Sequence, residues 1–257
     1  MDTWPDVLDE FQTIKLLQEQ YSLARMGDGE IKLAAGAGYV REPPNEALAA
    51  ELCAILTYPH ERCLVGIPRI FKQSPKYSNW VSRIPQFLPF LSPNVHYVSA
   101  FVSRPDSAPA IMTIEYAEAV QKMWAHKKVT LLSEPSNSLA TLIPRTARKY
   151  THVPAPHDHA YAHIGRLEKA CLRGAPDVVI LSAGPTATCL ASRLAARGVQ
   201  AIDLGSAGGF LLRLLPPDRL PPLYPVVLSH PGCVDVAAVR QRLEASGFQV
   251  HSHGEKG

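Results

Sequence analysis

The feature that most constrains the fold is a regular alternation of apolar, strand-like runs with helical segments. Its clearest unit begins at residues 178–181, where four consecutive apolar side chains are typical of a strand buried on both faces of a parallel sheet. A turn leads from this strand into a helix that extends to Arg197 and ends at Gly198, and residues 200–204 form the next strand. The repeated order of strand and helix predicts a layered α/β fold.

The remaining elements follow from hydrophobic periodicity and from the positions of proline and capping residues. Asn45 is placed to cap a helix, because its side chain can accept a hydrogen bond from a first-turn amide. Pro85 and Pro89 are expected to break the region 75–93 into short helical pieces. We expect further helices at residues 7–20, 46–56, 113–126, 139–150 and 158–173, and strands at residues 22–26, 64–67, 96–102, 128–133 and 152–153.

Length and a proline-rich stretch near the C-terminus determine the expected domain organisation. The chain has 257 residues, of which 46% are hydrophobic, and this suffices for one sizeable core. We expect a main domain at residues 1–215. Residues 216–222 read Pro-Pro-Asp-Arg-Leu-Pro-Pro, which is typical of a stiff linker. The linker begins a C-terminal segment, 216–257, that carries a small β-α-β unit (strand 226–229, helix 234–246, strand 248–251) and packs on the edge of the main domain.

The charge balance limits the kinds of partner that the surface can attract. Lys and Arg number 26 and Asp and Glu number 23, so the net charge is +3 and no broad basic field favours nucleic acid or an anionic membrane. The acidic N-terminus lacks the basic and apolar parts of a signal peptide, and no apolar run approaches the roughly 20 residues of a membrane-spanning helix. Five scattered cysteines indicate reduced thiols. We therefore expect a cytoplasmic protein that meets any anionic ligand locally.

The strongest candidate for chemistry is the turn Arg25-Met-Gly27-Asp28-Gly29-Glu30, which follows a predicted strand. Open α/β sheets bind their ligands at such strand ends. Two carboxylates at Asp28 and Glu30 supply oxygen ligands for a hard divalent cation and leave most of its coordination sphere to water and substrate phosphate. The alternative is a surface turn in which glycine supplies a positive φ and Asp28 caps the next helix. The residues alone leave these two interpretations about equally supported.

A second candidate is the turn Ser182-Ala-Gly184-Pro185-Thr186, which opens a helix after the most buried strand. Free amides and the dipole at a helix N-terminus can hold a phosphate. The alternative is ordinary capping, in which Ser182 or Thr186 satisfies the helix amides and no ligand binds. We favour a binding role, although the pattern is neither a P-loop nor a GxGxxG motif.

Three other features are weaker candidates. Arg104 lies just past a predicted strand, where its guanidinium could bind a diphosphate or simply be solvated. Asp203 ends another strand and could reach a ribose or sugar hydroxyl or cap the next helix. His157, His159 and His163 form a histidine-rich segment in which the last two would be one helical turn apart. Because no clear third ligand accompanies them, exposed histidines at a helix start are the favoured interpretation.

Taken in order, five segments resemble the GT-D-fold glycosyltransferases, a family formerly described as a domain of unknown function and known from bacterial adhesin glycosylation. The GDGE turn alone would be weak support, but its ordered combination with the SRP and GPTAT turns is specific. The resemblance extends over roughly residues 21–215. The matching segments are SLARMGDGEI at 22–31, FVSRP at 101–105, KVTLLSE at 128–134, LSAGPTAT at 181–188 and QAIDLG at 200–205.

The resemblance implies a Rossmann-like fold, with a mostly parallel sheet and helices on both faces, that binds a nucleotide-diphosphate sugar, usually a UDP-hexose. It places Asp28 and Glu30 on the metal-binding pair of the family, with Mn²⁺ or Mg²⁺ as the cation. The Gly184 turn then faces the diphosphate, with Arg25 and Arg104 as candidates to assist. The implied reaction is metal-dependent transfer of a hexose to a glycan or glycoprotein acceptor in bacterial surface glycan or protein glycosylation, by a chain that can form homo-oligomers.

Two segments depart from the family pattern and leave the donor sugar and the acceptor open. Residues 205–210 replace a Gly-His-x-Asp-x-Glu-Tyr stretch, and residues 136–141 replace a Gly-Asn-Asp-Leu stretch. Two other functions are therefore kept beside the transferase. One is a nucleotide-sugar hydrolase or another phosphate-handling enzyme, and the other is a non-catalytic partner that binds a sugar nucleotide for a different transferase.

Overall fold

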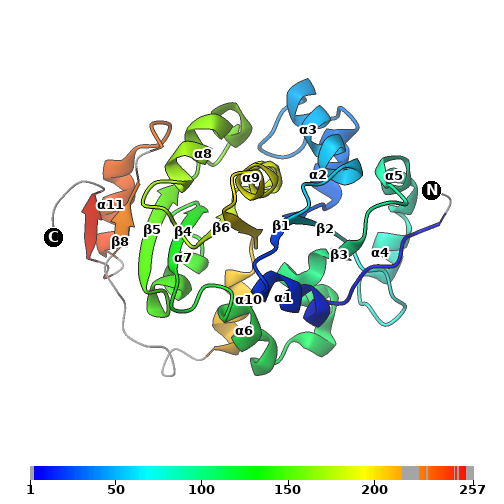
Figure 1. Cartoon of the computed structure of the whole chain (residues 1–257), viewed down its shortest axis with the longest axis horizontal. Coiled ribbons are helices and arrows are strands. Elements are labelled where there is room, and N and C mark those ends of the chain that lie inside the picture. The colour runs from blue at the N-terminus through cyan, green and yellow to red at the C-terminus, as the bar shows by residue number, and fades with distance from the viewer. Residues whose placement is uncertain (1–2, 216–225, 230, 246, 248, 253–257) are drawn as a thin grey trace.

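A single parallel sheet organises the protein. The computed structural model describes residues 3–215, 226–229, 231–245, 247 and 249–252. The strands of these residues form one nine-stranded sheet in the order β3-β2-β1-β7-β6-β4-β5-β8-β9, and every pairing between them is parallel (Figure 1). The strands are β1 (Ser22–Arg25), β2 (Cys63–Ile67), β3 (Tyr97–Ser99), β4 (Lys128–Ser133), β5 (Lys149–Pro154), β6 (Val178–Ser182), β7 (Gln200–Asp203), β8 (Val226–Leu228) and β9 (Val250–Ser252).

Helices cover both faces of the sheet, as the sequence predicts (Figure 1). Successive residues of a strand serve opposite cores: Leu131 packs on one face and Leu132 on the other. One core includes residues of α1 (Glu10–Gln18), α6 (Ile114–Gln121), α7 (Leu139–Leu142), α10 (Gly208–Leu214) and α11 (Val236–Ala245). The other includes residues of α2 (Asp28–Ala34), α3 (Glu46–Thr57), α5 (Ile84–Phe87), α8 (Ile164–Cys171) and α9 (Pro185–Ala196).

The C-terminal β-α-β unit continues the main sheet. Strand β8 pairs with β5, and β9 pairs with β8, so the unit lengthens the sheet at the edge beyond β5. The predicted linker at residues 216–222 lies outside the described residues, as does Phe248, the first residue of the predicted last strand. Within the described ranges, no helix has both the length and the apolarity needed to cross a membrane.

Local capping explains where several helices begin and end. The side chain of Asn45 accepts a hydrogen bond from the Leu48 amide at 3.0 Å, which confirms the predicted cap of α3. Asp9 and Gln12 form a reciprocal capping box, so α1 begins at Glu10 rather than at residue 7. Gly198, with φ of +76°, follows α9 as predicted.

The predictions differ from the structure where pairing in the sheet overrides local periodicity. The predicted helix 139–150 is instead α7 and a 3₁₀ turn, because residues from Lys149 onward pair with β4. The predicted strand 96–102 is only β3, since a 3₁₀ turn begins at Ala100. Pro85 and Pro89 each lie in the first turn of a short helix, where the missing N–H costs nothing. The short helices whose bounds have not yet been given are α4 (Tyr77–Val81), η1 (Leu88–Phe90), η2 (Ala100–Ser103), η3 (Pro105–Ser107), η4 (Pro109–Ile111), η5 (Ile143–Arg145) and η6 (Ala160–His163).

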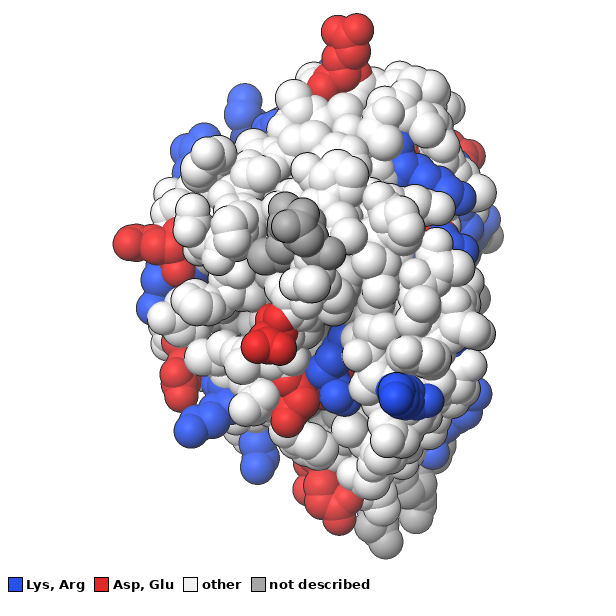
Figure 2. Space-filling view, turned by 90° about the vertical axis from the view of Figure 1, so that its right-hand side faces the viewer, with Lys and Arg blue, Asp and Glu red and all other residues white. Residues whose placement is uncertain are grey.

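Charged side chains are spread over the surface. Figure 2 shows the face at the β3 end of the molecule, where basic and acidic side chains lie interspersed. Asp106, for example, pairs with both Lys76 and Arg104. Binding of an anionic ligand therefore depends on local groups such as those at the strand ends.

Candidate functional site

The candidate site lies where the carboxyl ends of the central strands meet. Because all the strands are parallel, the segments that follow β1, β4, β5, β6 and β7 emerge at the same edge of the sheet. Two features lie there. We call residues 25–30 the acidic turn, and we call the pocket lined by residues between 39 and 206 the cavity. The helix α9, whose start lines the cavity, also contacts the acidic turn. The hydroxyl of Thr188 in α9 donates a hydrogen bond to the carbonyl oxygen of Arg25 at 2.9 Å.

The acidic turn places both of its carboxylates in the first turn of α2. Gly27 is the N-cap, and Oε2 of Glu30 accepts a hydrogen bond from its amide at 2.8 Å. Oδ2 of Asp28 lies 2.9 Å from Nη1 of Arg83, which the sequence analysis does not single out. Gly29 is required by close packing, since a Cβ there would lie 2.6 Å from the ring of Tyr39. The turn thus brings two carboxylates and a tyrosine together.

Arg25 and Asp203 support this turn from the strand ends. Nη2 of Arg25 lies 3.0 Å from Oδ1 of Asp203, and its Nε donates to the Asp203 carbonyl oxygen at 2.8 Å. The same Oδ1 accepts the Gly205 amide, and Gly205 has a φ of +46°. Asp203 is thus buried against Arg25, where it positions that guanidinium. It does not cap the next helix, α10, whose N-cap is Ala207, and its role toward a ribose or sugar hydroxyl stays a prediction.

Burial changes the acid–base properties of the acidic turn. Loss of solvent raises the pKa of the Glu30 carboxyl, and the negative charge of Asp203 adds to the rise. Burial also raises the pKa of Asp203, against the opposing effect of Arg25. Burial raises the pKa of the Tyr39 hydroxyl, and the negative charges of Asp28 and Glu30 add to the rise.

The residues of the acidic turn fit a hard divalent cation. Carboxylate oxygens are the ligands that Mg²⁺ and Mn²⁺ prefer. Among the described residues, no three His, Cys, Asp or Glu side chains converge into a ready-made metal site. Asp28 and Glu30 could supply two carboxylate ligands, and most of the coordination sphere would be left to water and to the oxygens of a substrate.

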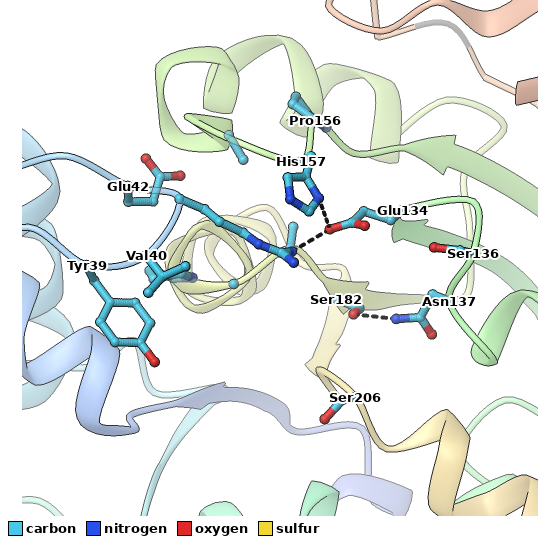
Figure 3. A pocket seen from close by; sticks show the side chains of 15 residues that line it. Tyr39, Val40, Glu42, Glu134, Ser136, Asn137, Pro156, His157, Ser182 and Ser206 are labelled. Carbon is cyan, nitrogen blue, oxygen red and sulfur yellow. Dashed lines mark hydrogen bonds and ion pairs between the residues drawn. The ribbon is translucent and has the colours of Figure 1, made fainter. Parts of the chain in front are cut away.

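The cavity lies beside the acidic turn and has a volume of about 460 Å³. This is within the range of small-molecule sites, roughly 300–1,000 Å³. Tyr39 belongs to both regions, because its ring packs on Gly29 and also lines the cavity. The remaining lining residues are Val40, Arg41, Glu42, Glu134, Ser136, Asn137, Pro156, His157, Ala160, Ser182, Ala183, Gly184, Pro185 and Ser206 (Figure 3).

Polar contacts across the cavity join segments that are far apart in the sequence. Oε1 of Glu134 lies 2.6 Å from Nη1 of Arg41 and 3.1 Å from Nδ1 of His157 (Figure 3). The side-chain amide of Asn137 donates to the hydroxyl of Ser182 at 2.7 Å. Arg41 has a φ of +75°, a rare value for a residue other than glycine that is found preferentially at functional sites.

Most of the predicted site residues lie in the acidic turn or in the lining of the cavity, whereas Thr186 and Arg104 lie in neither. Arg25, Gly27, Asp28, Gly29, Glu30 and Asp203 gather in and beneath the acidic turn, and Ser182, Gly184 and Pro185 line the cavity. Thr186 is fully buried, and its hydroxyl donates to Glu42 at 3.2 Å. Arg104 pairs with Asp106, away from both groups of contacts.

Sequence reasoning misses Arg41, Arg83, Glu134 and Asn137 as site residues. Glu134 and Asn137 directly follow β4, and that position is a signal that could have identified them. Arg41 and Arg83 lie in irregular or short helical segments with no comparable signal. His157 contacts Glu134, whereas His159 precedes the 3₁₀ helix η6 and His163 is its last residue, so these two histidines do not share an α-helical face.

Comparison with known proteins agrees with this architecture. The chain is 25% identical over 204 residues to a probable glycosyl transferase, Gly, of Streptococcus gordonii and 24% identical over 204 residues to the glycosyltransferase GlyD of Streptococcus pneumoniae serotype 4. Each match covers 74% of this chain. The chain spans only 30% and 25% of the length of these two relatives.

Solved structures of the domain of unknown function 1792 have the same fold. One of them, described as having a distinct glycosyltransferase fold, superposes with a TM-score of 0.69 at 24% identity and covers 79% of each chain. Another, a glycosyltransferase from Streptococcus sanguinis, has a TM-score of 0.67 at 23% identity and covers 78% of this chain and 81% of that one.

The match to a protein family extends over most of the sheet. It covers residues 23–208, from β1 to the start of α10, and so includes both the acidic turn and the cavity. This is well over half of the 257 residues. The chain belongs to the family of glycosyltransferases with the GT-D fold.

Proposed function

We propose that the protein transfers a hexose from a UDP-sugar to a glycan or glycoprotein acceptor, with Mn²⁺ or Mg²⁺ bound at the acidic turn. The observation that carries the proposal is the position of Asp28 and Glu30 beside a cavity of about 460 Å³ at the carboxyl edge of the sheet. Family membership and the names of the two streptococcal relatives support the reaction class. The resemblance noted in the sequence supports the UDP-hexose donor and a role in bacterial surface glycosylation.

Asp28 and Glu30 would hold the cation. When bound, a divalent cation neutralises the charge that develops on the departing nucleotide diphosphate. The Gly27 amide donates a hydrogen bond to Oε2 of Glu30, which fixes the orientation of this carboxylate. Asp28 is held by Arg83, and this guanidinium would become available to the diphosphate when the Asp28 carboxylate turns to a cation.

The start of α9 is the second proposed contact for the diphosphate. Gly184 and Pro185 line the cavity, and Thr188 anchors the same helix to the end of β1. Arg25 contributes indirectly, because its pairing with Asp203 keeps the strand ends beneath the turn in place. A direct role for Arg104, a cytoplasmic location and self-association stay predictions from the sequence.

Product analysis tests the proposal. The full chain is incubated with UDP-hexoses, Mn²⁺ and a panel of acceptor glycans, and the products are identified by mass spectrometry. We expect transfer to stop with EDTA and to return with Mn²⁺. Asp28→Asn and Glu30→Gln should lower the rate by about 10²-fold or more while the circular dichroism spectrum stays unchanged. Glu19→Gln, at an exposed carboxylate of α1's C-cap, is the matched control and should keep full activity.

Several outcomes would contradict the proposal. Full transfer activity in either variant, or undiminished activity in EDTA, would remove the metal-dependent mechanism. Free hexose released without any acceptor would indicate a nucleotide-sugar hydrolase. Binding of UDP without turnover of any sugar nucleotide would indicate a non-catalytic partner.

A further inference from the structure

We propose that the free carboxylate oxygen of Glu134 accepts a hydrogen bond from a hydroxyl on an uncharged sugar ring of the donor, and that the part of the cavity around Glu134 is the subsite for that ring. The inference rests on the proposed function and deepens it, because it separates the place of the ring from the place of the diphosphate. The ring is either the ribose or the transferred hexose, since both present adjacent hydroxyls of the same chemistry.

One oxygen of Glu134 is positioned and free. Oε1 takes the contacts from both Arg41 and His157, which fix the orientation of the carboxylate. No hydrogen bond or ion pair from another described residue reaches Oε2. The side chain is 32% exposed at the cavity wall, so a ligand can reach this oxygen. An ionised carboxylate only accepts hydrogen bonds, and hydroxyl groups are suitable donors for it.

The charges around the cavity favour a neutral ligand. Glu42 and Glu134 contribute two carboxylates, whereas Arg41 contributes one guanidinium, which is already paired with Glu134. Glu42 is buried and accepts hydrogen bonds from the Tyr161 amide at 2.9 Å and from Thr186 at 3.2 Å. A phosphate placed beside Glu134 and Glu42 would face this surplus of negative charge. A sugar ring carries no charge to be repelled.

The wall that continues from Glu134 offers hydroxyl and amide groups to the rest of the ring. Asn137 uses its side-chain oxygen for the Leu139 amide and one N–H for Ser182, which leaves its second N–H. Ser136, Ser182 and Ser206 line the same wall (Figure 3). A few fixed polar groups around a partly apolar space are typical of sites that recognise small neutral ligands.

The neighbouring acidic turn identifies the ring as part of the donor. Tyr39 packs on Gly29 and lines the cavity, so the two regions share a wall. In a sugar nucleotide both the ribose and the hexose are covalently joined to the diphosphate. A diphosphate at Asp28 and Glu30 therefore has one of its own sugar rings within reach of the cavity.

Calorimetric titrations in the presence of Mn²⁺ test the proposal. UDP and a UDP-hexose that the wild type accepts are titrated into the wild type, Glu134→Gln, Arg41→Gln and Asp158→Asn. Glu134→Gln keeps the size of the side chain and removes its charge. We expect it to weaken binding of one ligand by about 10-fold or more, because a hydrogen bond to a charged group is lost. Asp158 lies 3.9 Å from His157 but does not line the cavity, so Asp158→Asn is the matched control and should bind as the wild type does.

The two ligands distinguish the two rings. A loss already present with UDP assigns the ribose to Glu134, and a loss only with the UDP-hexose assigns the hexose. Unchanged binding of both ligands to Glu134→Gln overturns the inference, as does an equal loss in Arg41→Gln, which would mean that the ion pair rather than the free oxygen carries the effect. A wild type that binds neither ligand contradicts the proposed function itself, so the two failures remain distinct.

Discussion

The acidic turn and the cavity lie side by side, but they are assembled in different ways. The turn comes from six consecutive residues, and the hydrogen bond between Glu30 and the Gly27 amide lies within it, although Arg25 and Asp28 also pair with Asp203 and Arg83. The cavity is lined by segments between residues 39 and 206, and its central contact joins Arg41 to Glu134, 93 positions away. The residues of the turn are thus contiguous in the sequence, whereas the lining of the cavity comes together only when separate strands of the sheet pair.

This difference supports the separate task that we propose for each region. The acidic turn concentrates negative charge in a partly buried place, which suits a cation and the diphosphate bound to it. The cavity offers one free carboxylate oxygen and several neutral polar groups, which suit hydroxyls. Variants that damage one region and spare the other can therefore test whether the two regions differ in this way.

The largest effect on stability is expected behind the cavity, at His152. This fully buried histidine contacts the hydroxyl of Ser133, the residue before Glu134, and burial lowers its pKa to about 4. In the unfolded chain the imidazole of His152 takes up a proton near pH 6.5, whereas in the folded chain it stays neutral until about pH 4. The unfolding free energy is therefore highest above pH 6.5 and falls as the pH drops toward 4. The loss in unfolding free energy approaches roughly 3 kcal/mol.

Urea unfolding between pH 7.5 and 4.5 measures this effect. His152→Gln should flatten the pH dependence, and His96→Gln, at an exposed histidine, should leave it as in the wild type. If the unfolding free energy of His152→Gln has the same pH dependence as that of the wild type, protonation of His152 does not destabilise the fold behind the cavity.

The next effect concerns the close approach of α10 to α7 beneath the cavity. A Cβ at Gly208 would lie 2.6 Å from the backbone nitrogen of Leu139, which cannot move aside easily. Gly208→Ala should lower the unfolding free energy by about 1–3 kcal/mol. Gly209→Ala is the matched control, because it has nothing within 4 Å and should raise stability by up to about 1 kcal/mol. Equal thermal unfolding of the two variants would contradict this packing.

A smaller effect is expected beneath the acidic turn, at Gly205. A Cβ there would lie 2.4 Å from Nη2 of Arg25 and would push it away from the buried Asp203. Gly198→Ala carries a similar strain from its positive φ but touches nothing within 4 Å. Gly205→Ala should therefore lower the unfolding free energy by about 1 kcal/mol more than Gly198→Ala does. If chemical denaturation gives the same value for both, the Arg25–Asp203 pair does not stabilise the turn.

The sequence predicts the local features of the molecule better than the distant ones. The buried run 178–181, the cap at Asn45 and the turn at residues 27–30 are visible because each depends on neighbouring residues. The extent of β5 is not visible, because its residues 149–151 become a strand only by pairing with β4. The Arg41–Glu134 contact is hidden for the same reason, since it requires the ends of separate elements to meet.

Calorimetric titration of UDP tests the central claim, that the acidic turn binds the diphosphate through a divalent cation. The full chain is titrated with UDP in Mn²⁺ and again in EDTA, and Asp28→Asn is titrated in Mn²⁺. We expect UDP to bind the wild type in Mn²⁺. We expect this binding to be lost in the wild type in EDTA and in Asp28→Asn in Mn²⁺. Equal affinity in all three experiments would contradict this claim.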